Sequence, residues 1–413
     1  MFGRVAWYVS RAMFRLIFWP VLAPSLLFAV GTGAIMPVLV LAALQLGASQ
    51  ALASGLMALF GLAGLISTVP VGITIDRIGD RRAMVLATIS IAVVTALTVV
   101  ALAFPGRWSL VLFVAALGLR APATAAFSLA RQAVVADALP AEQRGQAMTA
   151  LGGTMRAGNL VGPILGGLLL LWFPLWSVFV FAVITALAAT ALLFIRRLNQ
   201  GFDETTERRK AARNDEELTQ GVRWGAVGLA GVAISALTIA RVSQPILIAL
   251  WGTHLGWDEA RISFIVAMGA AIEMILMIPG GYLKDSLGRA TILITCLVIY
   301  GAGFFIAPWI PTSWGFVVAV VVMSIGNGLG AGVNMTIGAD LSPNVGRAKF
   351  LSIWAMFSQV GGIGGPAAIS ALLVVASLST AMVSVGGLAW AGAAWMAVFA
   401  RSIGLPGRKS YQG

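Results

Sequence analysis

The chain has 413 residues, of which 59% are hydrophobic and only 10% are charged, and its formal net charge is +12. A soluble protein of this length cannot be so apolar without exposing large hydrophobic patches, so the composition excludes the soluble globular class. Apolar runs of about 20 residues, the length that crosses a bilayer, recur along nearly the whole sequence. We therefore expect a multi-pass protein embedded in the lipid bilayer.

Twelve apolar spans are expected, six on each side of a polar segment at 196–223. The first six lie within 17–195 and the second six within 224–401. The expected spans are 17–43, 50–75, 83–104, 109–136, 147–171, 175–195, 224–250, 260–283, 290–307, 314–339, 350–375 and 380–400. The predicted fold class is an all-α membrane protein of twelve transmembrane helices in two pseudo-symmetric six-helix halves.

The basic residues set the orientation in the membrane. They concentrate on one side of the spans, whereas the opposite loops hold only Arg107 and Arg261. By the positive-inside rule, both termini and the 196–223 linker are cytoplasmic, in a bacterial-type inner membrane. Residues 1–16 mix arginine with aromatic side chains, as an amphipathic surface segment does, and 402–413 form a tail. The positive charge thus reflects topology, and no nucleic acid partner is expected.

A sequence pattern repeats about half a chain apart. Pro-x-Gly-x-x-x-Asp-x-x-Gly, followed by cationic residues, begins at Pro70 and again at Pro279, an offset of 209, and a second set of matching residues is offset by 203. Constant offsets indicate an internal duplication in one orientation. Both copies fall on the cytoplasmic side, between the second and third spans of each half. The residues singled out on this cytoplasmic side are Gly72, Asp76, Arg77, Gly79, Arg81, Asp285, Gly288 and Arg289 in the two loops and Asp137 after the fourth span.

The sequence lacks the motifs of several classes of enzyme and metal site. The sequence contains no phosphate-binding loop of ATPases, no H-E-x-x-H and no cluster of Cys, His and acidic residues. We therefore expect no ATP hydrolysis, no enzyme activity, no metal and no cofactor. Cys296 is the only cysteine and is expected to pack inside a span. A transmembrane gradient, with protons as the expected coupling ion, remains as the driving force.

One acidic residue lies inside a span. Glu273 falls about thirteen residues into the eighth span, whereas every other acid lies in a loop or at a span end. A charge at the bilayer centre costs about 3 kcal/mol on insertion scales, so an intramembrane acid indicates function. We interpret Glu273 as a proton carrier. The alternative is a permanent ion pair with an arginine on a facing helix.

Four arginines also lie inside spans. Arg131 is close enough to the cytoplasm to extend its side chain to water. Arg120 and Arg156 lie near mid-span and should face a cavity, pair with Glu273 or bind a substrate. The alternative for nearby amides is interhelical hydrogen bonding. The expected cavity residues are Arg120, Thr124, Arg156, Asn159, Arg241, Gln244, Asn327 and Asn334.

The fifth span carries a ridge of small residues. Gly158, Gly162 and Gly166 recur every four residues, so another helix backbone can approach closely along this face. Pro163 within the ridge predicts a kink.

The first loop, Gly72-x-x-x-Asp76-Arg77-x-Gly79, resembles that of the major facilitator superfamily, and the resemblance covers the whole chain. It implies a cytoplasmic latch in which Asp76 faces the start of the eleventh span and the cations approach Asp137. Asp80, inserted before Arg81, departs from the usual pattern and leaves the cationic partner open.

The same family supplies two finer resemblances. The glycine-proline run at 158–167 resembles the exporters' signature, and Arg120 resembles an arginine of drug–proton antiporters, although Thr124 stands where those have glycine. Scattered segments are similar to bacterial sugar-efflux transporters, which implies that three polar residues face the central cavity. The segments are 128–131, 155–157, 244–246, 268–273 and 281–284, and the polar residues are Arg131, Arg156 and Glu273.

These observations predict a secondary active transporter that works by alternating access, as a monomer. The expected activity is proton-coupled export of a small molecule resembling a sugar or glycoside. The alternatives are multidrug or organic-anion efflux by proton antiport and, from other classes, a passive channel or a polytopic sensor.

Overall fold

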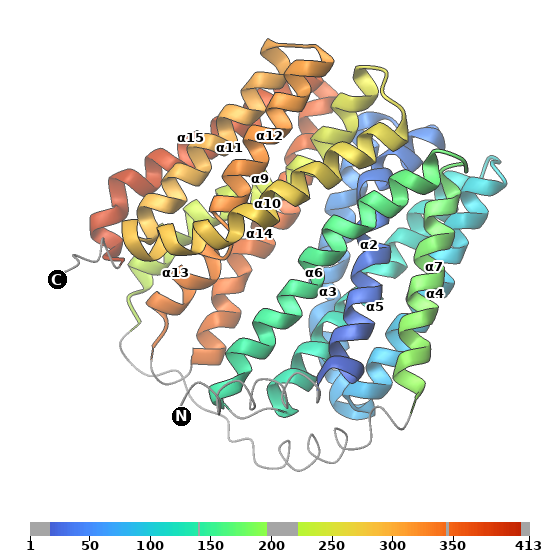
Figure 1. Cartoon of the computed structure of the whole chain (residues 1–413), viewed down its shortest axis with the longest axis horizontal. Helices are drawn as coiled ribbons and strands as arrows, with labels where there is room; N and C mark the ends of the chain where they lie inside the picture. The colour runs from blue at the N-terminus through green and yellow to red at the C-terminus, as the bar shows by residue number, and fades with distance from the viewer. Residues whose placement is uncertain (1–16, 139–140, 196–221, 344–346, 406–413) are drawn as a thin grey trace. The chain divides into compact units, whose positions relative to one another are not determined.

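A computed structural model describes residues 17–138, 141–195, 222–343 and 347–405. The predicted amphipathic segment 1–16, the linker as far as residue 221 and the tail from residue 406 lie outside the described residues. Within those ranges, all regular secondary structure is helical (Figure 1).

The helices follow the expected spans to within a few residues. The first six spans are η1 (Phe18–Leu22) with α2 (Ala23–Gln45), then α3 (Gln50–Ile78), α4 (Asp80–Ala103), α5 (Ser109–Ala138), α6 (Ala141–Leu170) and α7 (Trp176–Phe194). The second six are α9 (Trp224–His254), α10 (Glu259–Leu287), α11 (Arg289–Trp309), α12 (Ser313–Leu329) with α13 (Val333–Leu341), α14 (Arg347–Val375) and α15 (Leu378–Ile403). Among the described residues, 11 helical stretches are long and apolar enough to cross a membrane, and α6, which carries Arg156 and Asn159, is not among them. The predicted fold class is confirmed.

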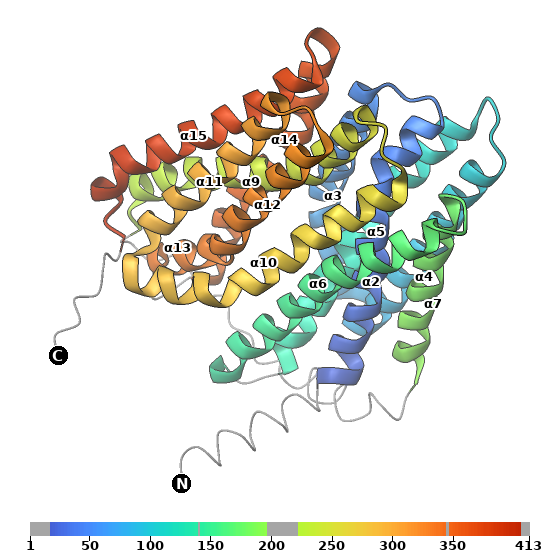
Figure 2. The same ribbon diagram turned by 45° about the horizontal axis from the view of Figure 1, so that its top comes forward.

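The chain divides into two compact units, residues 1–47 with 62–214 and residues 48–61 with 215–413. In the first unit α2 packs against α6 and α7, and α4 lies between α5 and α7 (Figure 1). In the second unit α9 packs against α14 and α15, and α11 lies between α12 and α15 (Figure 2). The first, third, fourth, fifth and sixth spans thus pack in the same way within each unit, as an internal duplication predicts.

Glycines allow the tight packing of the first and fifth spans in each unit. A Cβ atom added to Gly162 of α6 would lie 2.5 Å from the backbone nitrogen of Ala34 in α2. In the second unit, a Cβ on Gly361 of α14 would lie 2.8 Å from the carbonyl oxygen of Ser235 in α9. Any larger residue at these positions would force the two backbones apart.

The repeated loops have the same backbone conformation. Gly79 precedes α4 with φ 87° and ψ 151°, and Gly288 precedes α11 with φ 92° and ψ 152°. A positive φ of this size favours glycine. Asp80 is buried in the first turn of α4, and Arg81 donates from Nε (3.3 Å) and Nη2 (2.9 Å) to the carbonyl of Leu193. Arg81 therefore stabilises the C-terminal end of α7, where the helix dipole favours a cation.

Candidate functional site

The tenth span is broken near a cluster of polar side chains. α12 ends at Leu329, α13 begins at Val333, and Gly332 between them has φ +76°. Where a helix ends, its last carbonyl groups lack intrahelical partners, and inside a membrane each unbonded group is costly. Two cationic side chains from other helices bond to the carbonyls of this break, one to Gly330 and one to Ala331.

The first of these cations is Arg241 of α9. Its Nε donates to Oδ1 of Asn327 at 2.6 Å, and its Nη2 donates to the carbonyl oxygen of Gly330 at 2.9 Å. The C-terminal end of a helix carries a partial negative charge, so α12 attracts the guanidinium. Arg241 thereby joins α9 to α12, and the oxygen of Asn327, an expected cavity residue, accepts from Arg241.

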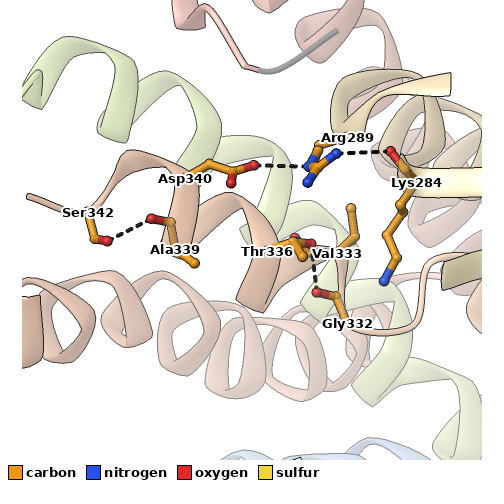
Figure 3. A network of polar contacts seen from close by, with 8 residues as sticks. All are labelled: Lys284, Arg289, Gly332, Val333, Thr336, Ala339, Asp340 and Ser342. Atoms are coloured by element: carbon orange, nitrogen blue, oxygen red, sulfur yellow. Dashed lines mark hydrogen bonds and ion pairs between the residues drawn. The ribbon is translucent and has the colours of Figure 1, made fainter. Parts of the chain in front are cut away.

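The second cation is Lys284 of α10, which is only 8% exposed. Its ammonium donates to the carbonyl of Ala331, and its own carbonyl accepts from Nη1 of Arg289 at 3.3 Å. Arg289 Nε also pairs with Oδ2 of Asp340 in α13 at 3.1 Å (Figure 3). The second copy of the repeated loop is thus bonded to the break itself and to α13, which follows it.

Further polar groups surround the break. Glu273 of α10 is partly buried, and its backbone lies against Gly328, where an added Cβ would be 3.0 Å from the Cα of Glu273. An added Cβ on Gly330 would meet Cys296 of α11 and would lie 3.3 Å from Nη2 of Arg241, so α11 also borders the break. Four helices, α9 to α12, contribute to this cluster.

Tyr300 was not among the expected site residues. It is completely buried and donates its hydroxyl hydrogen to Oε1 of Gln244, which is 7% exposed. The bond ties α11 to α9, as interhelical hydrogen bonds do. In the sequence, the feature that could have indicated this site residue is a single tyrosine within an otherwise apolar span.

In the first unit, Arg120 of α5 makes an interhelical link similar to that of Arg241. Its Nη2 donates to Oγ1 of Thr32 in α2 at 3.4 Å, and Thr124 bonds to the carbonyl of Arg120 itself at 2.9 Å. Arg120 links the first and fourth spans of its unit, just as Arg241 does in the other unit, but Nε of Arg120 has no partner.

Arg131 differs from the expectation that it extends to water. Only 7% of the residue is exposed. Its Nη1 donates to Sδ of Met155 at 3.3 Å, its guanidinium lies 5.6 Å from the ring centre of Phe127, and its Nε has no partner. The apolar groups of α5 and α6 cover the charge.

The other expected residues are dispersed. Asn334 bonds through Nδ2 to Ser358 at 2.7 Å and through Oδ1 to Trp354 at 2.8 Å, which is interhelical bonding within the second unit. Arg156 is partly buried on α6 and Asn159 is exposed. In the first loop Asp76 and Arg77 are exposed, and an added Cβ on Gly72 would meet nothing within 4 Å. The side chains of Asp137 and Asp285 lie outside the described set.

No metal centre is evident in the part of the chain that the structure describes. There, no three His, Cys, Asp or Glu side chains come together. The chemistry available at the break is ionic and hydrogen-bonding, from a carboxyl, two cations, two amides and a phenol.

Several characterised proteins are similar to this chain. The tetracycline resistance protein, class B, of Escherichia coli is 24% identical over 311 residues, which cover 74% of this chain and 75% of that protein. The multi-drug resistance efflux pump PmrA homolog of Lactococcus lactis is 26% identical over 61% of this chain and 62% of its own length. The inner membrane transport protein YajR of Escherichia coli is 28% identical, and the match spans only 30% of that protein.

Solved structures share the fold. A peptide transporter, POT, in complex with sulfate has a TM-score of 0.76 at 14% identity, with 95% of each chain covered. A D-xylose–proton symporter has a TM-score of 0.70 at 15% identity, covering 96% of this chain and 98% of its own.

The sequence profile of the Major Facilitator Superfamily matches residues 22–240 and again residues 224–411. Together, the two matches cover both six-helix halves. The chain belongs to the major facilitator superfamily and is a membrane transporter.

Proposed function

We propose that this transporter exports a small amphiphilic organic molecule in exchange for protons, as a monomer in the inner membrane with both termini cytoplasmic. The observation that carries the proposal is Glu273, an intramembrane acid next to a helix break that Arg241 and Lys284 bond. An intramembrane carboxyl is costly to keep, and reversible protonation is its best-attested use in transporters.

Protonation of Glu273 would change the balance of charge around the break. When Glu273 is ionised, its charge competes with Asn327 and the Gly330 carbonyl for the guanidinium of Arg241. When Glu273 is neutral, the bonds to Asn327 and to the Gly330 carbonyl hold Arg241. Because Gly330 lies between α12 and α13, a shift of Arg241 changes how α12 and α13 are held together. Proton binding thereby biases the conformation of the tenth span.

The relatives favour efflux of organic compounds, since two of them carry the names of tetracycline resistance and multidrug efflux proteins. A sugar or glycoside, the class suggested by the sequence resemblance, is the second candidate. It is favoured less because Gln244, in one of the resembling segments, is buried and bonded to Tyr300.

Transport by proteoliposomes tests the proposal. Vesicles with an acidic interior should accumulate at least one of three probes: ethidium, fluorescein or a radiolabelled methyl galactoside. Glu273→Gln should abolish the gradient-driven accumulation and retain exchange of the same probe, because only proton binding is lost. The matched control is Glu259→Gln, an exposed acid in the first turn of the same helix.

Accumulation by the Glu273→Gln variant at the wild-type rate would remove Glu273 as the coupling group. Conduction that neither saturates nor exchanges would instead support the channel alternative.

A further inference from the structure

We infer that the substrate carries an anionic group, a carboxylate, sulfonate or phosphate, and that Arg120 and Arg131 of α5 are its binding positions. The inference deepens the proposed function, on which it rests for the direction of transport. It starts from two guanidinium groups that are more than nine-tenths buried and have no carboxylate partner among the described residues.

The charges inside the membrane do not balance. The six expected spans of the first half contain no Asp or Glu, yet they hold Arg120, Arg131 and Arg156. The spans of the second half hold Arg241 and, at a span end, Arg261, together with one acid, Glu273. A single carboxylate can neutralise one of these arginines at a time. Arginine stays charged in proteins, so the excess positive charge must be met by backbone, water or a ligand.

Arg120 lacks adequate partners in the part of the chain that the structure describes. It is 6% exposed, its one side-chain hydrogen bond is the 3.4 Å contact with Thr32, and Nε has no partner. A guanidinium offers five N–H donors in a planar fork that matches an anionic oxygen pair. Most of that capacity is unused at mid-span.

Among the described residues, Arg131 is held by weak acceptors only. A thioether sulfur is a weak hydrogen-bond acceptor, and the Phe127 ring contributes a cation–π contact at 5.6 Å. An arginine with a purely structural role is expected to pair with a carboxylate or carbonyl oxygen, as Arg289 pairs with Asp340. The apolar environment of Arg131 also suits the non-polar part of an amphiphilic anion.

The two arginines lie on one face of α5. Eleven residues apart, they differ by about 20° around the helix and by about 16 Å along it. One small anion therefore cannot contact both. The geometry suits two successive positions, with Arg131 nearer the cytoplasmic end and Arg120 near the middle of the span.

Binding to purified full-length protein tests the inference without requiring transport. Equilibrium dialysis with fluorescein, an organic anion, should show saturable binding, and ethidium should not displace it. Arg120→Met should weaken binding by about tenfold to a hundredfold, since one charge-assisted contact changes affinity by that order. Arg120→Lys should keep part of the affinity. Arg107→Met, which removes an exposed arginine of the same unit, should change nothing.

Thermal unfolding separates a ligand position from a structural arginine. Replacing an unpaired buried charge by methionine should leave the melting temperature of Arg120→Met and Arg131→Met unchanged or raised. A lowered melting temperature with unchanged fluorescein affinity would overturn the inference. So would equal fluorescein binding by wild type and both variants, or no saturable fluorescein binding at all.

Different results would reject the proposed function and the anion-binding inference. Proton-driven export of ethidium without fluorescein binding would preserve the exporter and reject the anionic class. Arginine-dependent fluorescein binding without gradient-driven transport would preserve the anion positions and reject proton coupling.

Discussion

Replacing Arg241 tests whether a side chain holds the broken tenth span together. Arg241→Met removes hydrogen bonds to Asn327 at 2.6 Å and to Gly330 at 2.9 Å. Each hydrogen bond to a charged group contributes about 1.5–3 kcal/mol. The Gly330 carbonyl keeps its bond from the Val333 amide at 3.2 Å, and the cost of burying the guanidinium is relieved. We therefore expect a net loss of about 3 kcal/mol, smaller than the sum of both bonds.

Two measurements on detergent-purified protein check this expectation. If a unit of about 200 residues unfolds cooperatively, a loss of this size lowers the melting temperature by roughly 6–12 °C. Cys296, the only cysteine, lies against Gly330, so a loosened break should speed its reaction with a maleimide. Arg241→Lys should lie between wild type and Arg241→Met.

Arg261→Met is the matched control, because the side chain of Arg261 is 68% exposed and pairs with Asp258, three residues earlier on the surface. Wild-type melting and wild-type labelling of Arg241→Met would refute the claim that Arg241 holds the break.

Two further predictions concern packing and buried hydrogen bonds. Gly162→Ala should destabilise the protein, because the added methyl would lie 2.5 Å from the backbone of Ala34. In the control, Gly153→Ala in the same helix, the added methyl meets nothing within 4 Å, so this variant should be more stable than wild type by up to about 1 kcal/mol. Melting temperatures that move in the same direction for both variants would contradict this reasoning. Tyr300→Phe should cost about 1–3 kcal/mol, because Oε1 of Gln244 loses its buried donor. Tyr282→Phe, at a 75% exposed tyrosine, should melt like wild type, and equal melting of both tyrosine variants would exclude a stabilising bond.

The helices could be predicted because the length of an apolar run and the charges at its ends are local properties of the sequence. The break at 330–332 could not be predicted from the sequence. Glycines are common inside transmembrane helices, so Gly330 and Gly332 alone do not separate a break from close packing. The difference depends on Arg241 and Lys284, which approach the carbonyls from other helices.

The roles of individual polar residues were only partly predictable for the same reason. Asn327 and Asn334 look equivalent in the sequence, but one accepts from Arg241 and the other bonds to Trp354 and Ser358. Arg131 lies near the end of its expected span, where the sequence predicts that it reaches water, yet Met155 of another helix helps to cover it. The proton-carrying role of Glu273 and the latch around Asp76 and Asp137 stay predictions.

The broken tenth span has a mechanical consequence for a duplicated protein. Its counterpart in the first half, α5, runs unbroken from Ser109 to Ala138, and Phe127 occupies the position that corresponds to Gly330 at the offset of 203. The tenth span is interrupted where its counterpart in the first half is continuous. The two copies have therefore diverged in the continuity of this helix while retaining the packing of their spans. A chain assembled from two first halves would keep that packing and lack the break.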